Sequence, residues 1–503
     1  MDTLARPEAG IRVLLETRPA LDSHAGIPQQ TRLLFRGLSL IPELEVEGLL
    51  QSSTHALAAG VPRRMKTGRR RLEVHKKIDR LARIVIMLEQ KFLRSHLSAP
   101  LAAIRRLCGF SEQLTRFETG QFRDFIWRRL FSKSLPSADF DVVTKRSFRV
   151  AKTPWSAMHI SSLIFKYVGL RVFPRLDTED FDVMIAETPY PASVSKNTLL
   201  IIRYHDAIPV LMPHTISDRR YHQAFHYRAL RKNVESGAFF VCVSEATRKD
   251  LLSMFPEVES RSETIHNVVS HDYFDEPSTA DRVPEIIRTR LHQKGIPRAT
   301  TLRSWALAKG RKGDAIPYLL MVSTIEPRKN HLTLLAAWER LRAGTGAGLK
   351  LVLVGSLGWS QGPIMRKLIP WIARGEVFLL EDVPSPDLRL LYKHARVTVC
   401  PSFAEGFDLS GVEAMKSGGA VIASDIPVHR EVFSHAAEYF NPYSTEDLVR
   451  AIEAVIDPTQ YHRRDELITL GATVAARFDA EVIMQKWRTF LTARALAPGC
   501  VVR

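Results

Sequence analysis

The chain has only four cysteines among its 503 residues, and none of them is placed as a pair. A C-x-x-C spacing is absent, which argues against a disulfide framework and against a cysteine-rich zinc site. The 26 glycines and 28 prolines are close to average usage and recur with no short period, which argues against fibrous and solenoid architectures. Scattered thiols of this kind fit the reducing environment of the cytoplasm.

Long hydrophobic runs are also absent, since no stretch approaches the roughly 18 consecutive apolar residues of a membrane-spanning helix. The amino terminus, Met1–Gly10, lacks the basic and then apolar segments of a signal peptide. An apolar fraction of 45% with 25% charged residues is that of a folded globular protein. We therefore expect two or three domains in a cytoplasmic protein that is soluble or peripherally attached to a membrane.

Acidic residues are outnumbered in one part of the chain, where most of the net charge of +17 is found. Residues 60–150 hold 22 Lys and Arg against 8 Asp and Glu, with the densest run at Arg63–Arg71. Apolar residues that include Phe92 and Leu93 recur at helical spacing across Ile78–Arg94. The segment predicts a basic helical insertion with three interpretations: a solvated face, contact with an anionic membrane surface, or nucleic-acid binding. No reader motif for specific nucleic-acid recognition is present.

Two regions alternate short apolar runs with amphipathic stretches, which is the pattern of a doubly wound parallel sheet. The first region has strand-like runs at residues 11–15, 44–50, 183–186, 199–203 and 239–243. The second has them at residues 318–322, 350–354, 377–380, 397–400, 420–423 and 438–440. The sequence therefore predicts an α/β fold of two Rossmann-like domains that face a cleft, with ligands beyond the carboxyl ends of the strands.

The domain boundaries follow from composition. We expect residues 1–275 to form an N-terminal domain that carries the insertion at about 60–150. Residues 276–316 are rich in charge, proline and glycine, which predicts a linker with a short helix at Glu285–His292. Residues 317–475 form the second domain in this scheme, and residues 476–503 carry a helix that returns to the first.

The stretch Pro401–Asp425 is the most informative part of the chain for chemistry. It follows a strand, crosses a turn that contains Gly406, and enters a helix. Free backbone N–H groups at such a helix start suit a phosphate or a sugar oxygen. Glu405 lies in the turn and Glu413 about two helical turns later, so two carboxylates can accept hydrogen bonds from different hydroxyl groups of one long ligand.

This stretch resembles the donor-site motif of the retaining GT-B glycosyltransferases of group 1, family 4. The matching pattern is E-G-F-x-L-x-x-x-E-A-M-x-x-G, beginning at Glu405. Other matches to the family fall in the same order along the chain: E-P-R-K-N at 326–330, H-D at 205–206, V-S-E-x-T at 243–247 and N-V-V at 267–269. The resemblance covers residues 180–275 and 316–475 well and residues 60–180 hardly at all.

The resemblance implies that the N-terminal domain binds the acceptor and that the second domain binds the nucleotide sugar. It also implies a role for each matching residue. Arg328 and Lys329 are expected to neutralise the donor diphosphate, and Glu405 to contact the transferred sugar, while Glu413 contacts the nucleotide ribose. His205 is expected to line the acceptor side near the reacting carbon. Backbone N–H groups of the loop residues Gly406, Phe407, Asp408 and Leu409 are expected to reach the sugar or the phosphate, and Gly26 to keep the first loop close to the donor phosphates. The implied mechanism is front-face attack without a covalent nucleophile.

Departures from the family pattern bear on the choice of donor. Asp408 stands where the family usually has Gly, and Ser410 where it usually has Pro. A third carboxylate near the donor could bond a sugar hydroxyl, and members with this variant include mannosyltransferases, so GDP-mannose is the expected donor.

No metal and no cofactor beyond the nucleotide sugar are expected. His222 and His226 have helical metal-ligand spacing, but Gln223 follows where a zinc protease has Glu. The expected activity is transfer of a hexose to a growing, lipid-linked glycan of a surface polysaccharide, on the inner face of the cell membrane. The alternatives are a UDP-hexose donor, a non-catalytic glycan-assembly partner, and a basic nucleic-acid-binding protein.

Overall fold

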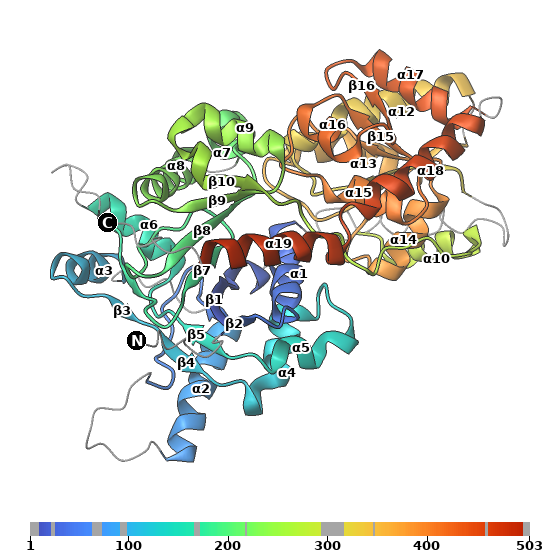
Figure 1. Ribbon diagram of the computed structural model, residues 1–503. Coiled ribbons are helices and arrows are strands. Elements are labelled where there is room, and N and C mark those ends of the chain that lie inside the picture. Colours follow the sequence, from blue (N-terminus) through green and yellow to red (C-terminus); the bar gives the residue numbers. More distant parts are fainter. Residues whose placement is uncertain are drawn as a thin grey trace, which may run out of the picture.

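The computed structural model describes residues 10–21, 26–62, 73–90, 98–164, 172–216, 219–292, 316–345, 348–457 and 461–495. Two α/β domains lie side by side, each with a largely parallel sheet covered by helices (Figure 1). The basic run Arg63–Arg71 and the apolar Phe92 and Leu93 lie outside the described residues. Where the chain is described, none of its helices has the length and apolar composition needed to cross a membrane.

The first domain is built on a sheet that has eight strands within the described residues, in the order β10-β9-β8-β7-β1-β2-β5-β4. Only β4 runs antiparallel to its neighbour. Its strands are β1 (Ile11–Glu16), β2 (Leu44–Leu50), β4 (Thr115–Phe117), β5 (Phe148–Val150), β7 (Val183–Ala186), β8 (Leu199–Tyr204), β9 (Phe239–Cys242) and β10 (Ser262–Thr264). The central strands are nearly continuous apolar runs because helices cover both faces of a parallel sheet.

Helices of the first domain connect these strands and carry the extra segments. They are α1 (Ile27–Ser39), α2 (Val74–Glu89), α3 (Ser98–Leu107), α4 (Arg123–Ile126), α5 (Phe140–Thr144), α6 (Trp155–Ile164), α7 (Ile208–Leu211), α8 (Arg219–Glu235) and α9 (Glu245–Met254). The short strands β3 (Glu112–Gln113) and β6 (Leu176–Asp177) pair with each other in a separate, two-stranded sheet.

The second domain has a parallel sheet in the order β13-β12-β11-β14-β15-β16. Its strands are β11 (Tyr318–Val322), β12 (Lys350–Val354), β13 (Val377–Leu380), β14 (Val397–Cys400), β15 (Val421–Ser424) and β16 (Ala437–Phe440). Its helices are α10 (Val283–Thr289), α12 (His331–Thr345), α13 (Gly362–Ala373), α14 (Ser385–His394), α15 (Leu409–Lys416), α16 (Pro427–Phe433), α17 (Thr445–Ile456) and α18 (Tyr461–Ala476). The strand order reverses between β11 and β14, which is where ligands bind in such sheets.

The last helix, α19 (Ala480–Ala495), lies alongside α1 of the first domain (Figure 1). Its apolar residues Ile483, Trp487 and Leu491 are buried in the core of that domain together with residues of β1 and β2. The chain therefore crosses between the domains twice, once before α10 and once before α19.

Two details differ from the sequence-based expectation. The segment at 60–150 is not purely helical, because it supplies β4 and β5, which extend the first sheet beyond β2. Three-residue strands are too short for hydrophobic periodicity to reveal. The expected linker at 276–316 begins with a packed element, because α10 buries Val283 and Ile286 against the second domain and the His292 N–H donates to the Leu379 carbonyl at 2.7 Å.

Candidate functional site

Two cations project from the turn that follows β11. Arg328 and Lys329 belong to a short 3-10 turn, Pro327–Lys329, that ends at Asn330. Asn330 has a left-handed backbone (φ 61°), a conformation that asparagine tolerates better than most residues. Its buried amide donates to the carbonyls of Pro401 and Pro442 at 3.0 and 2.9 Å, so the turn is tied to the loop after β14.

That loop carries Glu405, and the structure brings this carboxylate to the two cations. Glu405 Oε2 lies 2.7 Å from an Arg328 guanidinium nitrogen, and Oε1 lies 2.5 Å from Lys329 Nζ. Arg328 also binds Glu326 at 2.9 Å and donates to the Ala404 carbonyl at 2.6 Å. Burial alone would raise the pKa of Glu405, but Arg328 and then Lys329 hold that pKa below its ordinary value. The cluster therefore keeps an ionised carboxylate between two cations.

Glu413 lies on α15, inside the second domain, with its carboxyl group buried. Its two oxygens accept hydrogen bonds from Gln29 Nε2 of α1 and from the Tyr392 hydroxyl, each at 3.2 Å. Burial raises the pKa of Glu413 to about 7. The bond from Gln29 crosses from the first domain, so this carboxyl group also joins the two halves of the molecule.

Asp408 occupies the residue before α15 and has a left-handed backbone (φ 65°). Glycine adopts this conformation without strain, which explains the glycine at the matching position of the family. Here the carboxylate accepts a hydrogen bond from Ser410 Oγ at 2.6 Å and lies 3.1 Å from His429 Nε2. Burial would raise the pKa of Asp408, but the bond to His429 and the charge of Lys329 bring it well below its ordinary value.

Both carboxylate oxygens of Asp408 therefore have protein partners in this structure, which indicates that Asp408 holds the start of α15. A bond from Asp408 to a sugar hydroxyl stays a prediction. The Phe407 ring is buried and packs on Phe478 with ring centroids 5.1 Å apart, and the Leu409 side chain packs against the core of the second domain. The donor contacts expected from the backbone N–H groups of these residues stay predictions.

Gly406 lies where the two domains touch. A Cβ at this position would come within 1.8 Å of the His205 carbonyl oxygen, so only glycine permits this approach. The Gly406 carbonyl accepts hydrogen bonds from Ser244 Oγ at 2.7 Å and Thr247 Oγ1 at 3.3 Å. These contacts bring the donor loop and the first domain together.

A second contact between the domains is made by Glu431 of α16. Its carboxylate accepts hydrogen bonds from the N–H groups of Glu245 and Ala246, at 2.7 and 2.8 Å, at the start of α9. The same carboxylate lies 2.8 Å from His266 Nε2. A carboxylate is stabilised at a helix N-terminus by the free N–H groups there.

His205 lies across the cleft from Arg328. Its Nε2 is 3.2 Å from Glu187 Oε2, and Glu187 is fully buried. Both residues line a cavity of about 220 Å³ between the domains, to which the second domain contributes Arg328 and Trp359. His205 was expected from the sequence, whereas Glu187 was not. The signal for Glu187 was its position directly after β7, at the carboxyl end of a strand, where ligand-contacting residues of such folds occur.

Gly26 precedes α1 with a left-handed backbone (φ 70°), and no other residue approaches within 4 Å of a Cβ built there. Its carbonyl accepts from the N–H of Gln30 at 3.1 Å. The next residue, Ile27, lines the cavity that contains His205. The first loop therefore reaches the cleft, and a phosphate contact from Gly26 stays a prediction.

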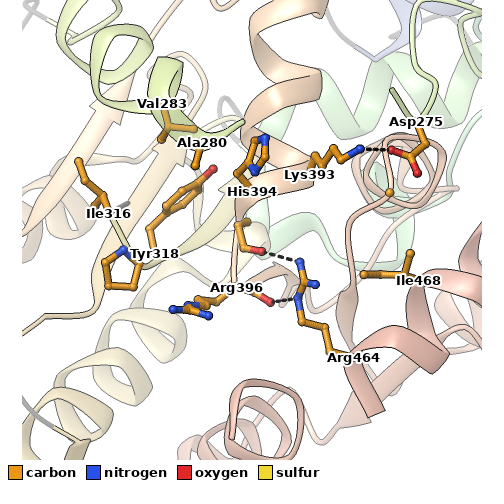
Figure 2. Close-up of a pocket in the computed structure, with 13 residues that line it drawn as sticks. Asp275, Ala280, Val283, Ile316, Tyr318, Lys393, His394, Arg396, Arg464 and Ile468 are labelled. Atoms are coloured by element: carbon orange, nitrogen blue, oxygen red, sulfur yellow. Dashed lines mark hydrogen bonds and ion pairs between the residues drawn. The ribbon is translucent and has the colours of Figure 1, made fainter. Parts of the chain in front are cut away.

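A larger cavity, of about 480 Å³, lies at the amino end of β11, away from these residues (Figure 2). The Lys393 ammonium there is paired with Asp275 at 2.5 Å, and Arg464 donates to the Arg396 and Ala395 carbonyls at 3.2 and 3.3 Å. Lys393 and Arg464 therefore already have partners within the protein. Ligand chemistry is better supported in the cleft between the domains. No three His, Cys, Asp or Glu side chains are grouped to hold a metal ion in the described part of the chain.

Comparison with known proteins finds a family match in the second domain. Residues 307–468 match the family model described as Glycosyl transferases group 1. A stretch of 215 residues is 29% identical to O-antigen chain mannosyltransferase B of Escherichia coli, covering 43% of this chain and 50% of that protein. Another of 169 residues is 36% identical to the serotype-specific mannosyltransferase WbdA of Escherichia coli, covering 33% and 20%. This chain thus spans half or less of the length of these relatives.

Solved structures agree with the two-domain architecture. Sucrose-phosphate synthase of Thermosynechococcus elongatus superimposes with a TM-score of 0.56 at 15% identity, over 96% of this chain and 100% of that one. HepE of Anabaena in complex with UDP-glucose gives 0.53 at 14%, with the same coverage. The predicted GT-B fold is confirmed. The match to the group 1 glycosyltransferase model falls on the second domain, where the sequence motifs resemble that family.

The buried Asp408–His429 contact predicts a large stability loss on substitution. We expect Asp408→Ala to lower the free energy of unfolding by roughly 3 kcal/mol at neutral pH, because it leaves His429 and Ser410 without their buried partner. Chemical denaturation measures this loss. The matched control is Asp425→Ala, which removes an exposed partner of Arg430 on the same helix, α16, and should cost less than about 1 kcal/mol. Equal losses in the two variants would contradict the structural role of Asp408.

The raised pKa of Glu413 predicts a pH-dependent stability difference. The folded protein keeps the proton of Glu413 up to about pH 7, whereas the unfolded chain releases it near 4.5, so folding becomes less favourable as the pH rises between these values. Relative to Glu413→Gln, the wild type should lose up to about 3 kcal/mol across this window and nothing more above it. Urea unfolding from pH 5 to 8 tests this. A constant difference between the two proteins would refute it.

Proposed function

We propose that the chain is a retaining, metal-independent glycosyltransferase that moves mannose from GDP-mannose to a growing, lipid-linked glycan of a surface polysaccharide. The observation that carries the proposal is the cluster of Arg328, Lys329 and Glu405 at the edge of an interdomain cleft. The family match supports the reaction class, and the relatives named as mannosyltransferases of O-antigen chains support the sugar and the type of product.

The donor half of the reaction belongs to the second domain. Arg328 and Lys329 neutralise the diphosphate, whose negative charge grows as the glycosidic bond breaks, so they stabilise the transition state more than the bound substrate. Glu405 accepts hydrogen bonds from hydroxyl groups of the mannose, and Glu413 from the ribose. The backbone N–H groups at the start of α15, from Gly406 to Leu409, point their partial positive charge at the same ligand.

The acceptor half belongs to the cavity that His205 and Glu187 line. An acceptor hydroxyl bound there attacks the anomeric carbon from the face that the diphosphate leaves. The bond from that carbon to the diphosphate oxygen breaks, its electron pair stays with the diphosphate, and the acceptor proton passes to the departing oxygen. Glu187 holds His205 in position beside this reaction, and the contact between Gly406 and His205 limits access of water.

The reaction is proposed to take place on the cytoplasmic face of the cell membrane. A lipid-linked acceptor requires the enzyme to work at a lipid surface, and the basic segment at 60–150 has the charge to be attracted to anionic headgroups. Its interpretation as a nucleic-acid-binding segment has no support from a reader motif.

Thermal unfolding with a panel of nucleotides tests the donor assignment. GDP and GDP-mannose, added with EDTA, should raise the unfolding temperature, since a ligand at 100 times its Kd adds about 2.7 kcal/mol of stability. UDP, UDP-glucose and UDP-N-acetylglucosamine should not. Free mannose and inorganic phosphate at the same concentrations serve as controls that leave the transition in place.

Two other results of this experiment would contradict parts of the proposal. A shift with UDP compounds alone would contradict GDP-mannose and favour a UDP-hexose transferase of the same fold. If no nucleotide shifts the transition and GDP-mannose is not consumed in the presence of isolated lipid-linked glycan, the enzymatic proposal is wrong and a non-catalytic role in glycan assembly replaces it.

A further inference from the structure

Helix α3 exposes a row of large apolar side chains that no part of the described chain covers. Leu101, Ile104 and Leu107 are 57%, 53% and 54% exposed, and Phe110 just beyond the helix is 62% exposed. The opposite side of α3 is buried through Ala99, Ala102 and Ala103 and packs on α6. The apolar row is therefore a solvent-facing surface of a docked helix, and the neighbouring Ile160 of α6, 43% exposed, adds to it.

Basic side chains accompany this row. Arg105 and Arg106 lie between Ile104 and Leu107, and residues 98–110 include no acidic residue. Neither guanidinium group is paired with a carboxylate within the described residues. A helix that exposes aliphatic and aromatic side chains next to unpaired cations has the composition of helices that lie in the headgroup region of a bilayer.

The position of α3 relates this surface to the acceptor cavity. The ring of His159 on α6 stacks on Phe225 of α8 with centroids 5.0 Å apart, and α8 supplies His222 and His226 to the wall of the cavity. The exposed row of α3 thus lies outside the helices that enclose the acceptor side. In Figure 1, α3 lies at the left edge of the first domain, on the side away from the second domain.

We propose that Leu101, Ile104, Leu107 and Phe110 insert into the headgroup and acyl boundary of an anionic membrane, with Arg105 and Arg106 on lipid phosphates. This names a surface and a mode of insertion for the membrane partner, and it rests on that part of the proposed function. Pairing of this row with a second copy of the chain would bring the arginines of two copies together, which charge repulsion disfavours. A nucleic acid would leave the four apolar side chains without a partner.

Vesicle flotation tests the proposal directly. Wild-type protein should float with vesicles of phosphatidylcholine and phosphatidylglycerol, and less with phosphatidylcholine alone. The combined variant Leu101→Gln, Ile104→Gln, Leu107→Gln should lose roughly tenfold or more of its partition coefficient, because burial of each side chain in the bilayer contributes that order of affinity. Arg105→Gln with Arg106→Gln should remove most of the preference for the anionic lipid.

The matched control is Leu40→Gln with Val482→Gln, two exposed aliphatic residues outside the 60–150 segment, just after α1 and on α19. It should float like the wild type, and the unfolding temperature should be unchanged in all variants because the replaced side chains are exposed. A second readout uses Cys108, which is exposed between Leu107 and Phe110, whereas Cys242 and Cys400 are buried. An environment-sensitive dye on Cys108, in a Cys500→Ser background, should shift to the blue when anionic vesicles are added.

The proposal is overturned if the α3 variant floats like the wild type or if the dye does not respond. It is also overturned if the wild type binds no vesicles while the same variant loses dimer formation on gel filtration or loses salt-sensitive RNA binding. Transfer from GDP-mannose to a water-soluble acceptor, measured on the same proteins, tests the catalytic proposal independently. Vesicle binding through α3 without any transfer would refute the enzyme and leave the membrane surface standing.

Discussion

The central constraint in this molecule is the burial of one carboxylate between two cations. Glu405 is almost inaccessible to solvent, and burying an unpaired charge there would be costly. Arg328 and Lys329 offset that cost, but only if the turn after β11 and the loop after β14 hold them within about 3 Å of it. Asn330 joins the turn to the loop after β14 through the Pro401 carbonyl, and to the segment after β16 through the Pro442 carbonyl. The carboxyl ends of neighbouring strands therefore create both the electrostatic site and the structure that holds it.

Contact between the domains extends this arrangement to the acceptor side. Gly406 follows Glu405 directly and packs its backbone on the His205 carbonyl, so the donor carboxylate and the acceptor histidine are positioned by the same contact. Glu431 on the N–H groups of α9 and Gln29 on Glu413 hold the domains together at two further points. Apolar contacts accompany these polar ones, since Val243 and Val269 of the first domain belong to the buried cluster of the second.

The sequence predicted the second domain in more detail than the first, for physical reasons. The donor residues Arg328, Lys329, Glu405 and Glu413 lie in short segments that follow strands, and these segments carry the motifs that resemble the family. Glu187 and Gln29 act through partners far along the chain, which no local pattern reveals. The contact of Asp408 with His429 was likewise not predicted, because His429 lies 21 residues away, on another helix.

One measurement tests the assignment of the cluster most directly: the rate of mannose transfer from GDP-mannose by Lys329→Met, beside its unfolding temperature. Glu405 keeps Arg328 as a partner in this variant, so the fold should persist with nearly the same unfolding temperature. If Lys329 stabilises the departing diphosphate, the rate should fall by about 100-fold or more. A folded variant that transfers mannose at the wild-type rate would contradict the account.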